Sequence, residues 1–415
     1  MKLNLILRIC LVAALIIFSL YSILKIPKLT YGFAAYYTSS RMVLEGEQLA
    51  KQYDFDYFNS KIKEYGFNNI QDMPNNLPSN VFVMLPLAWM EPGAAKITWG
   101  ILSILFLGAS VLLLLKSFDI KPSSVLGLIF MIFSLLFYPV YHNIALGQIY
   151  LLLLFLFSLS MYFIKQKKYD SSSIFPALTV VFKGYGFLLP IWFLVRKKSK
   201  AFFICTGAVV LMILISVPVL GFESWRVFAG VIKPYLLQND ASSMTVYQTV
   251  SGFLKHMFVF DEKWNPFPIT GLPHDTVFIF SALINLCIIY FFFKSAYKAD
   301  DDTHSVLISY ALILGVSVIT APLAEDYHYV LFLPLIFGLG KNLFAEGINK
   351  LTIPQIIFIS AIVLLALPLD LRFFYLEKPP LVLLAYFRLY AGIALLLLGA
   401  FEIKSRTLLF ALHSE

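Results

Sequence analysis

One charged residue interrupts a segment that otherwise suits a lipid bilayer. Lys183 lies at the centre of FPALTVVFKGYGFLLPIWFLVRKK, residues 175–198. A charge facing lipid at the centre of a bilayer costs about 2.5–3.5 kcal/mol, so this lysine needs a polar partner. A lysine beside the unpaired N–H groups that begin a helix suits an anion. The sequence therefore predicts an anion site at membrane depth, where the anion would be a lipid phosphate.

Other polar side chains lie where apolar segments end, all on one predicted side of the membrane. Carboxylates and histidines among them can act as acids and bases, and amides can hold a substrate. We expect this set to converge on one aqueous, outward-facing cavity, although each member taken alone is better explained as a solvated loop residue. The set is His142, Asn143, Gln148, Gln248, Glu325, Asp326, His328, Arg372, Glu377 and Lys378.

The composition indicates a polytopic membrane protein. Of the 415 residues 60% are hydrophobic and only 13% charged, whereas a soluble chain is about a quarter charged. Apolar runs long enough to cross about 30 Å of hydrocarbon recur throughout, and lipid requires such spans to be helical. The net charge of +8 comes from basic residues at span ends, which orient helices and do not indicate a nucleic-acid partner. Cys10, Cys205 and Cys287 all fall in apolar runs and predict neither a disulfide nor a metal site.

We expect a single transmembrane domain over residues 1–415. The first apolar run has a signal-peptide alternative, but it lacks a small-residue cleavage site and is predicted to be a retained span. Besides the segment around Lys183, the predicted spans are Leu5–Leu24, Ala94–Leu115, Ser123–Tyr141, Gly147–Ile164, Ala201–Leu220, Thr276–Phe293, Ser305–Ala321, Tyr329–Leu339, Pro354–Leu369 and Leu381–Phe401.

The distribution of lysine and arginine predicts a cytoplasmic N-terminus in the plasma (inner) membrane. Two large segments, residues 25–93 and 221–275, then lie on the outer, periplasmic face. The first contains YYTSSRMVLEGEQLAKQYDFDYF, an amphipathic pattern that predicts one or two helices lying at the interface, with a solvated loop as the alternative. No Asp or Glu falls inside a predicted span, which argues against ion-coupled transport.

The segment around Lys183 has basic clusters at both ends, 165–168 and 196–200. A simple crossing would place one cluster outside, so we predict two half-length helices, Ser172–Phe182 and Tyr185–Val195, that dip into the membrane and return. Gly184 and Gly186 supply the bend. One ordinary helix, with Lys183 paired inside the bundle, is the alternative.

Several motifs occur in a characteristic order: YGFAAYYTSSRMVLEGEQLAKQYD, LPSNVFVMLPLAWMEPGAAKITWGILS, NIALGQIYLLLLF, the Lys183 segment, VYQTVSGFLKHMF and APLAEDYHYVLFLPLI. Together they resemble glycosyltransferase family 87, which includes polyprenyl-phosphate-mannose-dependent α-mannosyltransferases. The resemblance implies a GT-C-type bundle of about 11–12 transmembrane helices. It also implies inverting transfer of a sugar from a polyprenyl-phosphate donor to a lipid-linked or glycan acceptor, without a nucleotide, a cofactor or an obligatory metal.

Matching positions assign substrate-binding roles to Arg41, Gln148, Lys183 and Gln248, and a role to His328. His142, Asn143 and Arg372 are further expected substrate contacts. One departure concerns catalysis, because the family has an aspartate, the expected base, where this chain has Gly32. Either another acid has the role or activity is changed or lost. The candidate replacements are Asp54, Asp56, Glu325 and Asp326, with His328 beside them.

Three functions therefore remain open. The first is an integral-membrane glycosyltransferase that moves a hexose, most plausibly mannose. The second is a non-catalytic membrane protein of the same fold that binds a lipid phosphate or glycan. The third is a flippase or polymerase of lipid-linked sugars.

Overall fold

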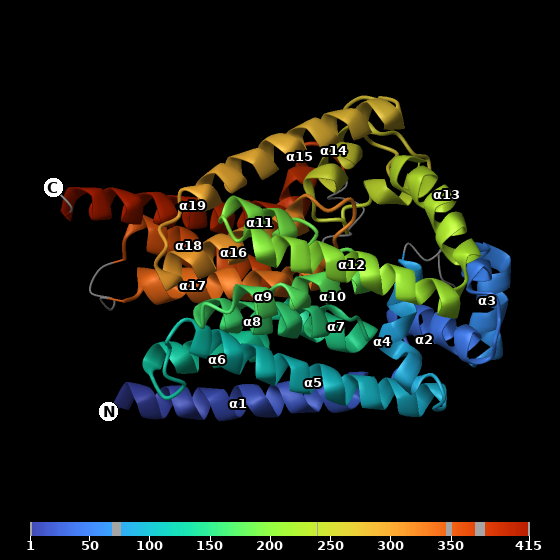
Figure 1. The fold of residues 1–415 in the computed structure, drawn as a ribbon, viewed down its shortest axis with the longest axis horizontal. Coiled ribbons are helices and arrows are strands. Elements are labelled where there is room, and N and C mark those ends of the chain that lie inside the picture. The colour runs from blue at the N-terminus through green and yellow to red at the C-terminus, as the bar shows by residue number, and fades with distance from the viewer. Residues whose placement is uncertain (1, 69–75, 239, 346–350, 370–377, 414–415) are drawn as a thin grey trace.

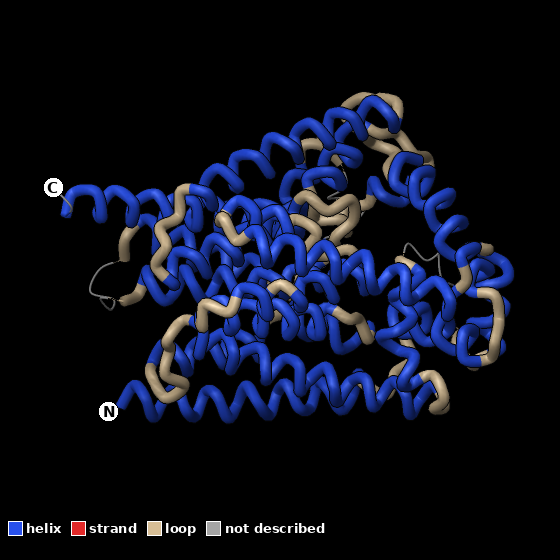
Figure 2. Tube along the Cα trace, in the orientation of Figure 1, coloured by secondary structure: helices blue, strands red, loops and turns tan. Residues whose placement is uncertain are grey.

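The chain is helical from end to end in the computed structural model, which describes residues 2–68, 76–238, 240–345, 351–369 and 378–413. The described residues form no strand, only an isolated bridge between Asp261 and Asn265. Figure 2 shows helices throughout, with the loops gathered mainly at their ends. The predicted all-α polytopic membrane class is confirmed.

Five helices of the described chain are long and apolar enough to cross a membrane. They expose many large apolar side chains, as lipid contact requires. These helices are α1 (Lys2–Lys25), α5 (Pro92–Ser117), α12 (Ser199–Leu220), α15 (His274–Tyr297) and α19 (Phe387–His413). Two further helices, α6 (Val125–Leu136) and α7 (Tyr138–Leu146), make a sixth span if they are taken together, bent by 41°. The bend falls at Phe137, whose extended backbone precedes a helix with proline in its first turn.

Shorter helices fill the interior. Every residue of α16 (Thr303–Ile319) from Ser305 onward is buried, and this helix packs against α15, α17 (Leu333–Leu343), α19 and α8 (Tyr150–Lys165). On another side of α17, α18 (Ile353–Ala366) packs against both α17 and α19. Several of these interior helices are shorter than a full membrane span, so the GT-C-type bundle of about 11–12 transmembrane helices stays a prediction.

The segment around Lys183 is broken as predicted. α9 (Tyr169–Ser172) and α10 (Ile174–Lys183) precede a turn, and α11 (Leu189–Val195) follows it. Gly184 and Gly186 have φ of 75° and 85°, where only glycine is free of strain. Residues 167–171 and 197–201 line one cavity, so both ends of the segment lie on the same side of the molecule. The single-helix alternative is wrong, although α11 begins at Leu189 instead of the expected Tyr185.

The two segments predicted for the outer face lie at the end of the molecule away from the N-terminus (Figure 1). The first forms α2 (Tyr31–Leu44), η1 (Leu49–Tyr53), α3 (Phe55–Glu64), η2 (Pro78–Asn80), α4 (Val81–Met84) and η3 (Leu85–Leu87). The second forms α13 (Phe222–Gln238), η4 (Asp240–Ser243) and α14 (Val250–Phe258). α2 differs from the expected interfacial helix, because ten of its 14 residues are buried, and it packs mainly against α4, η3, α3 and η1 of the same segment.

Candidate active site

The candidate site is built around a short 3-10 helix, η5 (Asp326–Phe332), which begins within the motif AEDYHY. Glu325 precedes this helix and forms a reciprocal cap with His328. The Glu325 carboxylate accepts from the His328 backbone N–H, and the Glu325 N–H donates to His328 Nδ1 over 3.0 Å. The cap therefore orients an acid and an imidazole together.

The imidazole of His328 contacts a buried tyrosine on α8. Its Nε2 lies 2.6 Å from the Tyr150 hydroxyl oxygen. Because Nδ1 accepts a hydrogen bond from the Glu325 N–H, the neutral ring carries its proton on Nε2, which donates a hydrogen bond to the Tyr150 hydroxyl oxygen. Burial, and after it the positive charge of Lys183, lowers the pKa of His328 well below its usual range. His328 is thus a neutral, oriented group just before the apolar run of α17.

Lys183 is the last residue of α10 and lies near both of these groups. Its ammonium donates to Asn76 Oδ1 and lies 5.1 Å from the centroid of the Tyr36 ring, a cation–π distance. The Glu325 carboxylate interacts electrostatically with Lys183. The helix start expected beside this lysine is absent, because residues 184–188 form a turn before α11. An anion would instead meet the ammonium and neighbouring hydroxyl groups.

Gln148, just before α8, contacts Tyr36 of α2, the residue whose ring lies near Lys183. Its Oε1 accepts from the Tyr36 hydroxyl over 2.8 Å. The same amide lies against Gly32, where a Cβ atom would be 2.7 Å from Gln148 Nε2 and 2.8 Å from the Leu146 carbonyl oxygen. A side chain at position 32 therefore requires Gln148 or the backbone to move.

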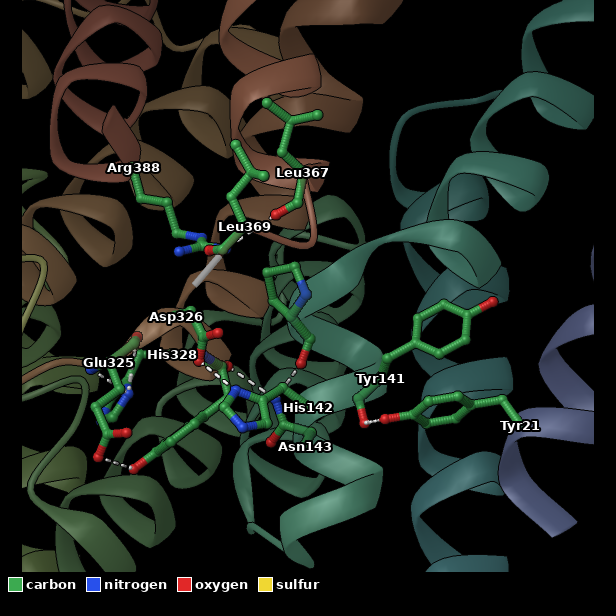
Figure 3. Close-up of polar contacts among 12 residues, drawn as sticks. Tyr21, Tyr141, His142, Asn143, Glu325, Asp326, His328, Leu367, Leu369 and Arg388 are labelled. Carbon is green, nitrogen blue, oxygen red and sulfur yellow. Dashed lines mark hydrogen bonds and ion pairs between the residues drawn. The ribbon is translucent and has the colours of Figure 1, made fainter. Parts of the chain in front are cut away.

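A second contact ties α7 to η5. His142 Nδ1 lies 2.6 Å from Asp326 Oδ1, and the Asn143 side-chain amide donates to the Tyr327 carbonyl over 2.8 Å. Figure 3 shows the His142–Asp326 pair close to Glu325 and His328. Asp326 is 8% exposed, so its carboxylate serves this pair, whereas the half-buried Glu325 is the more accessible acid.

Four further residues were expected in the site, and three of them contact other parts of the chain. Asp54 caps α3 by accepting from the Tyr57 N–H, and Asp56 is an exposed residue of the same first turn. Arg41 binds Glu45 over 2.6 Å and the Ala88 carbonyl over 2.9 Å. The Gln248 amide donates to the Thr245 and Ala385 carbonyls. Asp54, Arg41 and Gln248 thus have contacts that stabilise local structure, and the roles expected of the four residues stay predictions.

The remaining residues expected in the site are Arg372, Glu377 and Lys378. Arg372 and Glu377 lie outside the described residues. Lys378 lies 4.4 Å from the centroid of the Phe267 ring.

Two buried basic residues were not expected from the sequence. Lys96, fully buried on α5, donates to the Ile144 and Ala145 carbonyls and so caps the end of α7. Arg388, 4% exposed on α19, donates to the Leu367 and Leu369 carbonyls above the His142–Asp326 pair (Figure 3). Both lie within predicted spans, so the signal that singled out Lys183, a charge in an apolar run, also marks them. The tyrosines of the site carry no such signal.

Among the residues that the structure describes, no three His, Cys, Asp or Glu side chains come together as ligands for one metal ion. The groups that do come together are an ammonium, an accessible carboxylate, a neutral imidazole and tyrosine hydroxyls. Such a set can bind an anion and remove a proton from a neighbouring hydroxyl.

The fold defines a polytopic helical membrane protein, and the candidate site gathers groups that can bind an anion and act as acid or base. Residues 78–322, more than half of the chain, match glycosyltransferase family 87, and the chain belongs to this family. It is therefore a membrane glycosyltransferase by family. The match includes Lys183, Gln148 and His142 and ends three residues before Glu325. No curated protein and no solved structure matches the chain.

Proposed function

We propose that this protein transfers a hexose, with mannose as the first candidate, from a polyprenyl-phosphate donor to a lipid-linked or glycan acceptor. The observation that supports this best is the placement of Lys183 and Glu325. A partly buried ammonium and an accessible carboxylate interact across one site at the border of an apolar bundle. An amphiphilic phosphate donor and a hydroxyl acceptor need these two groups.

In the proposed reaction Lys183 holds the donor phosphate. The bond between the anomeric carbon and the phosphate oxygen breaks, and the electron pair leaves with the phosphate. The negative charge that develops there is stabilised by the ammonium, with Asn76 and the Tyr36 ring holding that ammonium in place. The donor needs no nucleotide or metal in this scheme.

Glu325 is the proposed base. Its carboxylate takes the proton of the acceptor hydroxyl while the acceptor oxygen forms the new bond to the anomeric carbon from the opposite face, which inverts the configuration. The Tyr327 hydroxyl donates to Glu325 over 2.9 Å, and the His328 N–H donates as well. Both contacts orient the carboxylate. Asp54 and Asp56 lie on α3 and have no such arrangement.

His328 and Tyr150 are proposed to position the substrates as a neutral hydrogen-bonded pair. An imidazolium beside Lys183 would repel it, and the buried neutral form avoids this cost. We place the active site on the outer face of the plasma membrane and the N-terminus in the cytoplasm. The basic residues at the opposite ends of the helices support this orientation.

The test uses the purified full chain in nanodiscs with polyprenyl-phosphate-[14C]mannose, and with the glucose and galactose equivalents. We expect donor binding and transfer to a lipid-linked or oligosaccharide acceptor for one of these sugars. Lys183→Met should weaken donor binding at least about tenfold, whereas the matched change Lys63→Met on the exposed surface of α3 should not. Wild-type protein that binds none of the donors would contradict the proposal.

A non-catalytic role is favoured by one specific observation, the absence of a carboxylate at Gly32 together with the amide of Gln148 in its place. This alternative predicts donor binding that depends on Lys183 but no transfer by any variant. Binding with transfer would exclude it, and binding without transfer, with every acceptor tried, would establish it over the enzyme.

A further inference from the structure

A second polar cavity lies far from the candidate site. It has a volume of about 420 Å³ and is lined by two segments, residues 167–171 and 197–201. The candidate site adjoins Tyr150 at the start of α8, and the cavity follows Lys165 at its end. The length of α8 separates them by about 22 Å at 1.5 Å per residue. Nothing in the proposed transfer uses this cavity.

The cavity is strongly basic. Five lysines, Lys167, Lys168, Lys197, Lys198 and Lys200, line it together with one acid, Asp170. Lys200 pairs with Asp170 over 2.6 Å, and Lys198 lies 4.6 Å from the centroid of the Tyr169 ring. The other three lysines make no ion pair within the described chain. The cavity therefore carries an excess of four positive charges.

The two segments present their lysines in the same way. Directly after the C-cap of α8 and of α11 comes a residue in the left-handed region, where glycine is usual, and here it is lysine. Lys167 and Lys197 have φ of 60° and 57°. The following N–H groups, of Lys168 and Lys198, bond back to the Phe163 and Phe193 carbonyls over 2.9 and 2.8 Å. The strained backbone after each of the two helices thus places two consecutive lysines at the same cavity.

An exposed apolar surface adjoins the cavity. Phe203, one turn into α12 from the cavity, is 69% exposed, and α12 is one of the five helices that could span a membrane. Clusters of four to eight basic residues directly at the end of a spanning helix attract anionic headgroups. Surface lysines alone would do this diffusely, but here they line an open cavity of a size that can hold a headgroup.

We propose that this cavity binds a phosphate group, carried by an anionic lipid headgroup or free in solution. The lysines neutralise the phosphate, and Ser171 and Ser199, which also line the cavity, supply hydroxyl donors. The site is independent of the proposed transferase activity, because it lies at the other end of α8 and shares no residue with the candidate active site.

The experiment measures binding to the purified full chain in neutral detergent. Short-chain phosphatidylglycerol, the matching phosphatidylcholine and inorganic phosphate are titrated separately, with thermal stabilisation as the readout. We expect saturable, salt-sensitive binding of phosphatidylglycerol and none of phosphatidylcholine. Inorganic phosphate that competes with the lipid identifies a general phosphate site, and lipid binding without such competition identifies a headgroup site.

Two sets of matched variants decide the location. The triple variant Lys167→Gln, Lys197→Gln, Lys198→Gln should weaken phosphatidylglycerol binding at least about tenfold. A control of equal charge change uses exposed lysines outside the cavity, Lys116→Gln, Lys121→Gln, Lys294→Gln, and should stay within about twofold.

Asp170→Asn distinguishes an effect on the cavity from a loss of binding through misfolding, because it is expected to increase binding. It removes the acid of the cavity and frees Lys200, so binding should tighten severalfold. The proposal is overturned if the cavity and control triples lose binding equally, if neither loses it, or if Asp170→Asn leaves the affinity unchanged.

Discussion

The side-chain amide of Gln148 occupies the space beside Gly32 into which a larger residue would extend. A Cβ atom at position 32 would lie 2.7 Å from Gln148 Nε2, and the Tyr36 hydroxyl holds that amide from its other end. Gly32, where the resemblance leads us to expect an aspartate, is thus matched to a neighbour that fills the adjacent space. An aspartate at position 32 would therefore require Gln148 or the backbone to move as well as adding a carboxylate.

Gly32→Ala is therefore expected to destabilise the protein by about 1–3 kcal/mol, because a methyl group overpacks a closed contact. Thermal unfolding in detergent measures this. Gly230→Ala on α13 is the control, since its Cβ would meet nothing within 4 Å, and alanine there should be neutral or stabilising. Equal stability of the Gly32→Ala and Gly230→Ala proteins would show that Gln148 moves away at no cost.

Tyr36 has two separable contacts, so two substitutions should differ. Tyr36→Phe removes the hydrogen bond to Gln148 and should cost about 1–3 kcal/mol of stability, because a buried amide oxygen loses its donor. It keeps the ring beside Lys183, so donor binding should hold. Tyr36→Leu removes the ring as well and should also weaken donor binding.

The control for this pair is Tyr65→Phe. The Tyr65 hydroxyl donates to Glu45 at the surface, where water can replace it. Unfolding and donor-binding measurements on all three proteins decide the matter. If Tyr36→Phe weakens donor binding as much as Tyr36→Leu does, the hydroxyl and not the ring supports Lys183.

Glu325→Gln tests the proposed base. The change keeps the shape of the side chain but removes its capacity to accept a proton, so transfer should fall about 10²–10⁴-fold while donor binding is retained. Asp54→Asn is the matched control, because asparagine also caps a helix and α3 should stay intact. Single-turnover transfer rates and donor binding are measured for both. Full activity in Glu325→Gln would assign the base elsewhere.

Much of the architecture follows from the sequence because lipid restricts it. Apolar length alone predicts α1, α5, α12, α15 and α19, and the basic clusters around Lys183 predict that its helix is broken. The sequence does not distinguish buried from interfacial helices, so α2 was expected at the surface. Its pattern of small and aromatic residues is compatible with either position.

The candidate site is harder to predict because its geometry depends on contacts between distant segments. Lys183 and His328 stand out as polar residues in apolar surroundings. Glu325 and Asp326 are adjacent and alike in sequence, and only the contact of Asp326 with His142 separates their roles. Tyrosine is common in membrane helices, so nothing in the sequence marked Tyr150 as the partner of His328.

The buried imidazole of His328 gives a prediction with a definite sign. Its pKa in the folded protein lies well below the value of about 6.5 expected in the unfolded chain. Between those two values the unfolded chain binds one more proton than the folded protein does. The contribution of His328 to stability is therefore complete above pH 6.5 and declines as the pH falls, by about 1.4 kcal/mol per pH unit.

Thermal unfolding between pH 5 and 8 measures this loss as the difference between wild type and His328→Gln. The variant is less stable at pH 8, but its stability should fall less steeply toward pH 5, because glutamine does not titrate. His274→Gln, a change at the start of α15, should keep the steep wild-type decline. Parallel pH profiles for wild type and His328→Gln would mean that the imidazole is already protonated in the folded protein, and the neutral pair with Tyr150 would then be wrong.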